Sequence, residues 1–398
     1  MAYAPTGRRP RPWLMLGLGT AAQTAGTVFM TTPAFLIPLL HTERGLSLAQ
    51  AGTLASAPTL GIVLTLIAWG ALADRIGERW VITAGLALTA AATALAMVAG
   101  GFVGLGLALL LGGMAAGSPN SASGRLVMGW FARDRRGLAM GIRQMAQPLG
   151  TTIAALTVPT AARHGLVWAL AVPLMATSLC AIACAVGIVD PPRARPVAGG
   201  RPERPPNPYR ASSFLWRIHL VSALLVVPQF LLAVFGLVWL MTDQGWTELA
   251  AGLLIGASQF VGGLGRIAVG VVSDRVGSRV GPLRWVSLAA VAAMLGLAGL
   301  DAAHSGLAAG LLVVATAISV ADNGLAFTSV AEAAGPFWAG RALGTQNTGQ
   351  FLTAAAVGPL FGALIATVGY PVSFLLAAVA PAVATPLIPS VDEEDHPI

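Results

Sequence analysis

Long apolar runs alternate with short polar breaks along the whole chain. A run of about 18 or more mostly apolar residues can cross the hydrocarbon core of a bilayer as a helix. The pattern predicts an all-α integral membrane protein with twelve transmembrane helices. We place these at 13–40, 47–72, 80–99, 102–127, 138–160, 166–188, 214–241, 248–272, 284–301, 306–330, 341–367 and 371–389.

The composition supports a membrane protein over a soluble one. Charged residues make up 10% of the 398 residues and apolar residues 56%, whereas soluble proteins contain roughly 25% charged residues. All 23 basic residues are arginine, and the net charge is +7. We interpret these arginines as topology determinants and expect the lipid bilayer, not a nucleic acid, as their partner.

The arginines are unevenly divided between the two sides of the predicted bundle. With the N-terminus placed inside, 21 arginines fall on the inner side and only Arg44 and Arg163 on the outer side. Because positively charged loops stay in the cytoplasm, we expect a multi-pass protein of a bacterial-type cytoplasmic (inner) membrane, with both termini cytoplasmic.

A segment rich in proline and arginine divides the chain. Residues 190–212 show no apolar periodicity and are predicted to form a flexible cytoplasmic linker. The linker separates an N-terminal half of six helices, residues 1–189, from a C-terminal half of six helices, residues 213–398.

The two halves share sequence patterns, which indicates an internal repeat. The loop after the second predicted helix reappears after the eighth at an offset of 200 residues. It contains Gly70, Asp74, Arg75, Gly77 and Arg79 in the first copy and Gly270, Asp274, Arg275, Gly277 and Arg279 in the second. At an offset of 203, Asn120, Gly137, Gly141 and Gln147 align with Asn323, Gly340, Gly344 and Gln350. The halves are therefore predicted to be parallel copies.

The chemistry of this loop suits a contact between helices. Gly70 and Gly77 allow a tight turn and close helix approach. Asp74 can cap the N-terminal end of a helix, and Arg75 and Arg79 can bridge to an acid such as Asp134. A turn with topology-setting arginines is the alternative interpretation.

The loop G-x-L-x-D-R-x-G-x-R at 70–79, its copy at 270–279 and the twelve spans together resemble the major facilitator superfamily. The resemblance covers the whole chain and implies two parallel six-helix repeats around a central substrate site. It also implies that the two loops form a cytoplasmic gate that latches in one state and opens in the other. It further implies a protein that functions as a monomer.

Polar residues inside the spans are functional candidates, because they are costly in a bilayer. Helix five carries Arg143, Gln147 and Thr151 at intervals of four, and helix eleven carries Gln346, Gln350 and Thr353 at matching places. We predict that these stripes, with Asn120 and Asn323, line a substrate cavity. Hydrogen bonding between neighbouring helices is the alternative.

Charged groups within the spans suggest the chemistry of transport. The Arg143 guanidinium suits a carboxylate or phosphate. Asp322 is the predicted proton carrier, because burial disfavours a charged carboxylate, although it can instead be a packing partner of Asn323. Arg125 and Arg266 lie near predicted helix ends and are interpreted as interface anchors.

The sequence therefore predicts a secondary active transporter that couples uptake of a small organic anion to protons. The stretch Gly129-Trp130-Phe131 through Arg136-Gly137 looks like the connection found in organic-anion symporters of the superfamily. A drug/proton efflux antiporter and a uniporter remain alternatives. No catalytic set indicates an enzyme, and the five scattered histidines give no metal pattern. No cofactor is expected.

Overall fold

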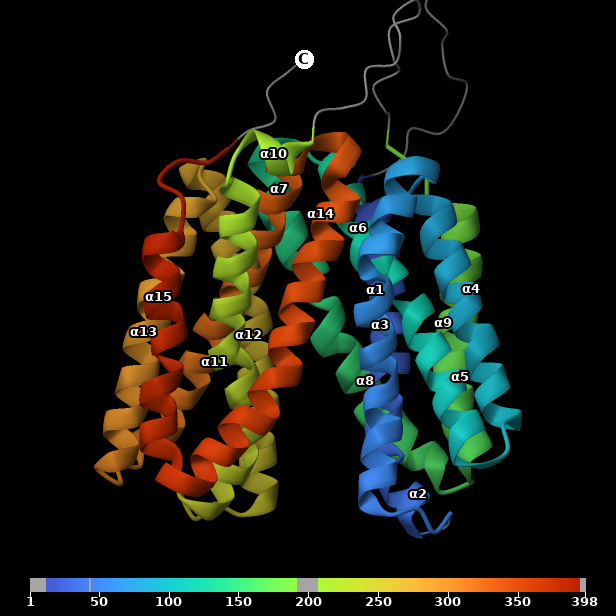
Figure 1. Cartoon of the computed structure of the whole chain (residues 1–398), viewed down its shortest axis with the longest axis horizontal. Coiled ribbons are helices and arrows are strands. Elements are labelled where there is room, and N and C mark those ends of the chain that lie inside the picture. Colours follow the sequence, from blue (N-terminus) through green and yellow to red (C-terminus); the bar gives the residue numbers. More distant parts are fainter. Residues whose placement is uncertain (1–11, 43, 192–206, 394–398) are drawn as a thin grey trace, which may run out of the picture.

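The computed structural model describes residues 12–42, 44–191 and 207–393, and within these ranges it is helical with no strand (Figure 1). Two groups of roughly parallel helices stand side by side, one formed by the first half of the chain and one by the second. Most of the predicted linker, residues 192–206, lies outside the described ranges, as do Arg8, Arg9 and Arg11.

The first half contains nine helical segments, some of which follow each other directly. They are α1 (Pro12–Phe35), α2 (Ile37–Thr42), α3 (Leu48–Ile76), α4 (Glu78–Val98), α5 (Gly101–Ala116), α6 (Ser118–Trp130), α7 (Arg133–Arg143), α8 (Ala146–Ala162) and α9 (Leu166–Gly187). The segments α5 and α6 together form the fourth predicted span, and α7 and α8 form the fifth.

The second half begins with a short segment at the end of the linker. Its helices are α10 (Pro208–Ala211), α11 (Phe214–Thr242), α12 (Glu248–Val276), α13 (Val280–Ala302), α14 (Leu307–Ala377) and α15 (Val379–Leu387). The long α14 is not one straight helix, because Gly335 (φ 68°) and Gly369 (φ 78°) have non-helical conformations inside it. These two glycines separate the tenth, eleventh and twelfth predicted spans.

The helices account for the predicted span number. Eight segments of the described chain are long and apolar enough to cross a membrane. Dividing the last of these at Gly335 and Gly369 gives ten, and α1 together with the pair α7–α8 brings the number to twelve.

Both copies of the repeated loop are bounded in the same way. A side-chain cap begins each preceding helix: Ser47 accepts a hydrogen bond from the N–H of Gln50, and Thr247 accepts one from that of Ala250. Glycine ends both helices with a positive φ, 107° at Gly77 and 70° at Gly277, a region that favours glycine. The predicted turn role of Gly77 therefore holds in both halves.

Helix five is interrupted in its middle, between α7 and α8. Gln144 and Met145 keep right-handed helical dihedrals there, but the N–H of Met145 donates to the carbonyl of Ile142, three residues before it. Pro148 follows in the first turn of α8. Proline has no N–H, and its ring pushes away the carbonyl of the residue four positions before it. The Gln144 carbonyl is therefore released from the helical hydrogen-bond pattern.

The outer faces of the bundle are apolar, as a bilayer requires. Large apolar side chains lie exposed along the helices, for example Leu64, Leu107 and Val186. Such exposure would be costly in water, whereas lipid chains can cover it. Together with the spans, these faces support a membrane-embedded protein.

Candidate functional site

The carboxylate of Asp74, at the end of α3, reaches across to the second half. It accepts hydrogen bonds from the main-chain N–H groups of Gly340 at 2.8 Å and Arg341 at 3.1 Å. Asp74 also forms ion pairs with Arg125 and with Arg341. We call this set of contacts the first gate contact.

Asp274, at the end of α12, repeats this arrangement in the opposite direction. Its carboxylate accepts from the N–H groups of Gly137 at 2.9 Å and Leu138 at 2.8 Å in α7. Arg279 pairs with it at 2.6 Å. We call this set the second gate contact, and the two are equivalent under the internal repeat.

The glycines at these contacts let the two backbones touch. A Cβ atom added to Gly340 would lie 2.4 Å from the carbonyl oxygen of Gly70, and one added to Gly137 would lie 2.4 Å from that of Gly270. Real Cβ atoms do not approach other atoms so closely, so both pairs need glycine for this packing. The predicted close approach at Gly70 is thus observed, with Gly340 as its partner.

Arg125 lies inside the first gate contact, which corrects its interpretation as an interface anchor. Its side chain is buried between two acids, pairing with Asp74 and, at 2.6 Å, with Glu78. Buried charges persist where they are paired, so α6 is fixed to the ends of α3 and α4. Sequence reasoning missed Glu78, although its place beside Arg79 in the repeated loop was visible.

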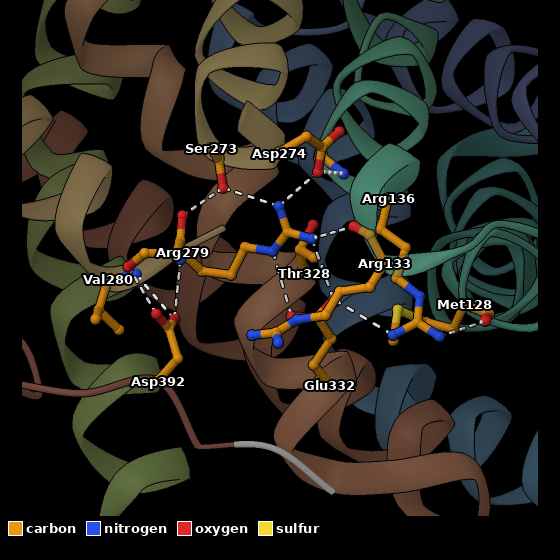
Figure 2. A network of polar contacts seen from close by, with 12 residues as sticks. Met128, Arg133, Arg136, Ser273, Asp274, Arg279, Val280, Thr328, Glu332 and Asp392 are labelled. Atoms are coloured by element: carbon orange, nitrogen blue, oxygen red, sulfur yellow. Dashed lines mark hydrogen bonds and ion pairs between the residues drawn. The ribbon is translucent and has the colours of Figure 1, made fainter. Parts of the chain in front are cut away.

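Arg279 is the centre of a larger polar network around the second gate contact (Figure 2). Glu332 accepts from its guanidinium at 3.3 Å and pairs with Arg136 of α7 at 3.4 Å. Asp392 accepts from the main-chain N–H of Arg279 at 2.9 Å. The network thereby joins α7, α13, α14 and the segment after α15. Glu332 was not selected from the sequence.

Arg79 has different partners from the expected ones. Its N–H donates to Asp190 at 2.8 Å, and its guanidinium donates to the carbonyl of Ala185 at 2.8 Å. Asp134 instead lines a shallow cavity beside Asp274 and Arg275. The Arg79–Asp190 bond is the first-half counterpart of the bond between Arg279 and Asp392.

The halves are packed together at one end of the bundle only. We call this end, which carries Asp190, Asn207 and Asp392, the linker side; it is uppermost in Figure 1. One buried apolar cluster contains residues of both halves there, including Met140 and Leu343. At the other end, which we call the opposite side, each half has its own cluster. The linker side is therefore closed in this conformation.

A small polar cavity lies between the halves and is lined by residues of both. Its lining consists of eight carboxamide side chains and three phenylalanines: Gln23, Asn120, Gln144, Gln147, Gln229, Asn323, Asn347, Gln350, Phe230, Phe327 and Phe351. Its volume is about 20 Å³, room for about one water molecule. An organic solute can enter only if lining side chains move.

The carboxamides follow the internal repeat. Gln23 donates to Asn120 at 2.8 Å in the first half, and Asn323 donates to Gln229 at 2.9 Å in the second. Gln350 adds a bond to Asn323 at 2.7 Å. The repeated hydrogen-bonded pairs thus fill most of the space between the two walls.

Four of the predicted substrate-binding residues line this cavity, namely Asn120, Gln147, Asn323 and Gln350. Thr151 is exposed and lies outside the lining. Gln346 is also outside it and is hydrogen-bonded to His219, which in turn bonds the hydroxyl of Tyr209 at 2.9 Å. Gln147 and Thr151 both belong to α8, so Thr151 lies outside the lining because it is about one helical turn farther along the same helix.

Four further lining residues were missed, namely Gln23, Gln144, Gln229 and Asn347. Gln144 and Asn347 are separated by the same offset of 203 residues that relates the other pairs, so the repeat could have revealed them. Gln23 and Gln229 are 206 residues apart, and a fixed-offset search does not find them.

Arg143 lies directly behind the cavity wall and is fully buried. Its guanidinium donates to Ser123 at 2.8 Å, to the main-chain oxygen of Asn120 at 2.8 Å and to the side-chain oxygen of Gln144 at 3.0 Å. No carboxylate of the described chain lies within ion-pair distance of it. The guanidinium charge is therefore held by neutral oxygen atoms, two of them on residues that line the cavity.

Arg266 and Asp322 form a second buried charged group. The guanidinium of Arg266 donates to the main-chain oxygens of Val320 at 3.2 Å and Gln144 at 2.7 Å. This burial corrects the interpretation of Arg266 as an interface anchor. Asp322 is also buried, and neither of its carboxyl oxygens has a hydrogen-bond partner within the part of the chain that the structure describes.

Comparison with known proteins assigns this chain to a family. The Major Facilitator Superfamily family model matches residues 16–357. An uncharacterized MFS-type transporter of Mycobacterium tuberculosis is 48% identical over 98% of this chain and 87% of its own length. A probable chloroplastic anion transporter of Oryza sativa subsp. japonica is 33% identical over 40% of this chain and 30% of its own.

A solved structure has the same fold. The human organic anion transporter MFSD10 superimposes with a TM-score of 0.74, at 19% sequence identity, over 96% of this chain and 100% of the other. The similarity extends over both halves, so the fold is shared as a whole.

Proposed function

Because the chain belongs to the major facilitator superfamily, we propose that it is a secondary active transporter that takes up a small organic anion together with protons by alternating access. The membrane-embedded two-half fold is shared with other transporters of the family. The charge of the solute, the coupling to protons and the direction of transport are inferred from the residues of the site.

The observation that supports an anionic solute is the buried guanidinium of Arg143. A cation without a carboxylate partner is costly in an apolar interior. Within the described chain the acceptors of this guanidinium are neutral oxygens and the Met140 sulfur, and the Phe327 ring lies 5.6 Å from its central carbon. An incoming carboxylate would form charge-assisted, bidentate hydrogen bonds with such a fork. Gln144, which separates the guanidinium from the cavity, would have to turn aside.

Two of the similar proteins agree with this class of solute. One is named a probable anion transporter and the other an organic anion transporter. Their names describe those proteins, and the plant protein aligns with only 40% of this chain. Their names favour a role of Arg143 in binding an anionic solute over a purely structural role.

The direction is proposed with the linker side placed in the cytoplasm, as the arginine distribution favours. The observed conformation, with its linker side closed, then corresponds to a state open to the outside. Solute and proton would enter from there, and the gate contacts would break when the halves rock. A ligand drives such a change only through a difference in affinity between the two states.

Drug/proton efflux is the second candidate, and the three phenylalanines of the cavity favour it. Phe230, Phe327 and Phe351 offer apolar area that would suit a hydrophobic compound. However, a cationic drug would meet Arg143 rather than an acid behind the first-half wall, and this repulsion favours the anion.

The test is proton flux in proteoliposomes with a pH dye inside. Organic acids, sugars and cationic drugs would be added outside in turn. We expect lumen acidification with one class of acid, lost in Asp322→Asn. Acid transport without proton flux would indicate a uniporter. Accumulation of cationic drugs driven by an inward-acidic gradient, with no response to acids, would overturn the proposal in favour of efflux.

A further inference from the structure

The lining of the polar cavity between the halves is neutral and rich in hydrogen-bonding groups. Eight of its side chains are carboxamides, and no charged side chain of the described residues is among the lining. Each carboxamide has an amino group that donates hydrogen bonds and a carbonyl oxygen that accepts them. A hydroxyl group is the small neutral partner that can donate and accept at the same time. Such walls therefore suit a solute with several hydroxyl groups.

Each wall keeps a free hydrogen-bond donor beside its bonded pair. The bond from Gln23 to Asn120, at 2.8 Å, uses the carbonyl of Asn120, and the amino group of Asn120 has no acceptor among the described residues. The bond from Asn323 to Gln229, at 2.9 Å, uses the carbonyl of Gln229 and leaves its amino group without an acceptor in the same way. Both walls thus offer a side-chain N–H group to a solute.

Free acceptors belong to the same lining. Asn347 donates to the main-chain oxygen of Leu343 at 2.8 Å, and Gln350 donates to Ser222 at 2.8 Å. In the described part of the chain, no donor reaches the side-chain oxygen of Asn347 or Gln350. Gln147 forms no side-chain hydrogen bond with the described chain, so both of its groups are available. The lining therefore presents donors and acceptors together.

Other kinds of organic anion fit these walls poorly. A plain alkyl chain would displace water from the free donors and acceptors and return no hydrogen bond, and a site built for hydroxyl groups discriminates strongly against analogues that lack them. An amino acid would bring an ammonium group, for which the described lining holds no carboxylate. A sugar phosphate would bring a second negative charge, whereas Arg143 supplies one positive charge behind the wall.

The phenylalanines agree with a hydroxylated carbon skeleton. Phe230 and Phe351 offer apolar ring faces within an otherwise polar lining. The face of an aromatic ring is electron-rich, so carbon-bound hydrogens of a sugar-like solute can pack against it. A compact solute with hydroxyl groups at its edge and carbon-bound hydrogens on its faces can therefore use both kinds of side chain.

We propose that the solute is a polyhydroxylated carboxylate, of the class of the sugar acids, with its carboxylate on Arg143 and its hydroxyl groups on the carboxamides. This inference rests on the proposed function and specifies the solute within it. The carboxylate takes the place of the Gln144 side-chain oxygen, which accepts from Arg143 at 3.0 Å. The hydroxyl groups bind the free groups of both walls, including those of Gln147 and Gln350. The lining side chains move apart to admit the solute, since the observed cavity has a volume of about 20 Å³.

The test compares acids that differ only in hydroxyl groups. Gluconate and hexanoate are unbranched monocarboxylates with the same number of carbon atoms, but only gluconate carries hydroxyl groups. Isothermal titration of the purified full chain would measure binding of a panel of sugar acids that includes gluconate, alongside hexanoate, the neutral sorbitol and a hexose phosphate. We expect at least one sugar acid to bind about a hundredfold more tightly than hexanoate, and also more tightly than sorbitol.

Two methionine substitutions remove hydrogen-bonding groups with little change of volume. Gln147→Met in the first half and Gln350→Met in the second should each weaken binding of the sugar acid about tenfold. Binding of hexanoate should not weaken, because it makes no hydrogen bond to these groups. Gln147→Met is the cleaner change, since it breaks no hydrogen bond within the described chain. Thr157→Val, at an exposed position of α8, is the control and should bind like the parent.

The outcomes separate this inference from the proposed function. Equal affinities for sugar acids and hexanoate, or a Gln147→Met protein that binds the sugar acid like the Thr157→Val control, would overturn the role of the hydroxyl groups and leave an organic anion as the solute. A panel in which no sugar acid binds, or only the hexose phosphate does, would also overturn the inference. Sorbitol bound as tightly as every sugar acid would refute the carboxylate, and with it the anion of the proposed function.

Discussion

Asp74 of the first half accepts a hydrogen bond from the main-chain N–H of Gly340 in the second half, at 2.8 Å. The internal repeat places the same bond between Asp274 and Gly137, at 2.9 Å. Each carboxylate therefore binds main-chain N–H groups in the second turn of a helical stretch of the other half. Closure of the linker side depends on two equivalent contacts that can be altered one at a time.

Replacing Asp74 by asparagine should slow transport much more than it weakens binding. Asparagine keeps one acceptor oxygen but loses the charge that faces Arg125 and Arg341, and charge-assisted hydrogen bonds are about twice as strong as neutral ones. We expect turnover to fall about tenfold, which corresponds to about 1.4 kcal/mol. Initial uptake rates and equilibrium binding measured on the same protein check this.

The control for this change is Asp134→Asn, because Asp134 is exposed and bonds to neither gate. It should transport at nearly the parent rate. Lost binding in a folded Asp74→Asn protein would contradict a role limited to the gate.

Leucine at Gly340 should keep the linker side from closing. Even the first side-chain carbon would lie 2.4 Å from the carbonyl oxygen of Gly70 and 2.6 Å from Asp74, and backbone contacts of this kind cannot relax cheaply. We expect increased labelling of a single cysteine placed at Leu138 on the gate. Gly358→Leu is the control, since nothing lies within 4 Å of an added Cβ there; equal labelling of both proteins would refute the prediction.

Arg125→Ala should destabilise the folded protein strongly. The change leaves the buried carboxylates of Asp74 and Glu78 without their shared cation, and breaking a buried pair in this way costs about 3–5 kcal/mol. Unfolding in mixed detergent micelles measures the difference. Arg275→Ala, at an exposed position of the repeated loop, should cost about 1 kcal/mol or less. Similar losses in the two proteins would show that the buried cluster is not a source of stability.

Arg143→Lys should bind the organic acid poorly although it keeps the positive charge. Lysine cannot present the planar fork that holds two oxygens at once, and it cannot replace the bonds to Ser123 and Asn120 together. We expect the dissociation constant to rise about a hundredfold, which is about 2.7 kcal/mol. Isothermal titration checks this, with the exposed Arg163→Lys as control. Parent-like affinity would reduce Arg143 to a packing residue.

The gate could be predicted from the sequence because the repeat marks it twice. The repeated glycines and aspartates form the contacts between the halves, and Gly340 and Gly137 were already aligned through their offset. Their role as a gate stays a prediction. The partners of Arg79 and Arg125 could not be predicted in the same way. Which acid an arginine meets depends on how helices from distant parts of the chain are tilted, and a one-dimensional pattern does not contain this information.

The cavity was predicted only in part, for a related reason. Helical periodicity places Gln147 and Thr151 on one face of α8, but it does not tell how far along the helix the cavity extends, and the lining ends before Thr151. The role of Pro148 is also invisible to a search for polar side chains, because the group that it releases is a main-chain carbonyl. The proline is visible in the sequence, but only the hydrogen bond from Arg266 to the Gln144 carbonyl shows which partner the free oxygen has.

The two walls of the cavity are not equivalent, although the two halves are repeats of each other. The first-half wall consists of four carboxamides with Arg143 behind them, whereas the second-half wall adds all three phenylalanines. Gln346 stands where the repeat would place a second arginine. Phe327 lies against Arg143, with its ring 5.6 Å from the central carbon of the guanidinium, whereas Phe230 and Phe351 are left to contact other parts of a solute. A solute with a charged head at Arg143 and an apolar face would therefore be oriented, with one aromatic ring of the C-terminal half beside its head and two available to its apolar face.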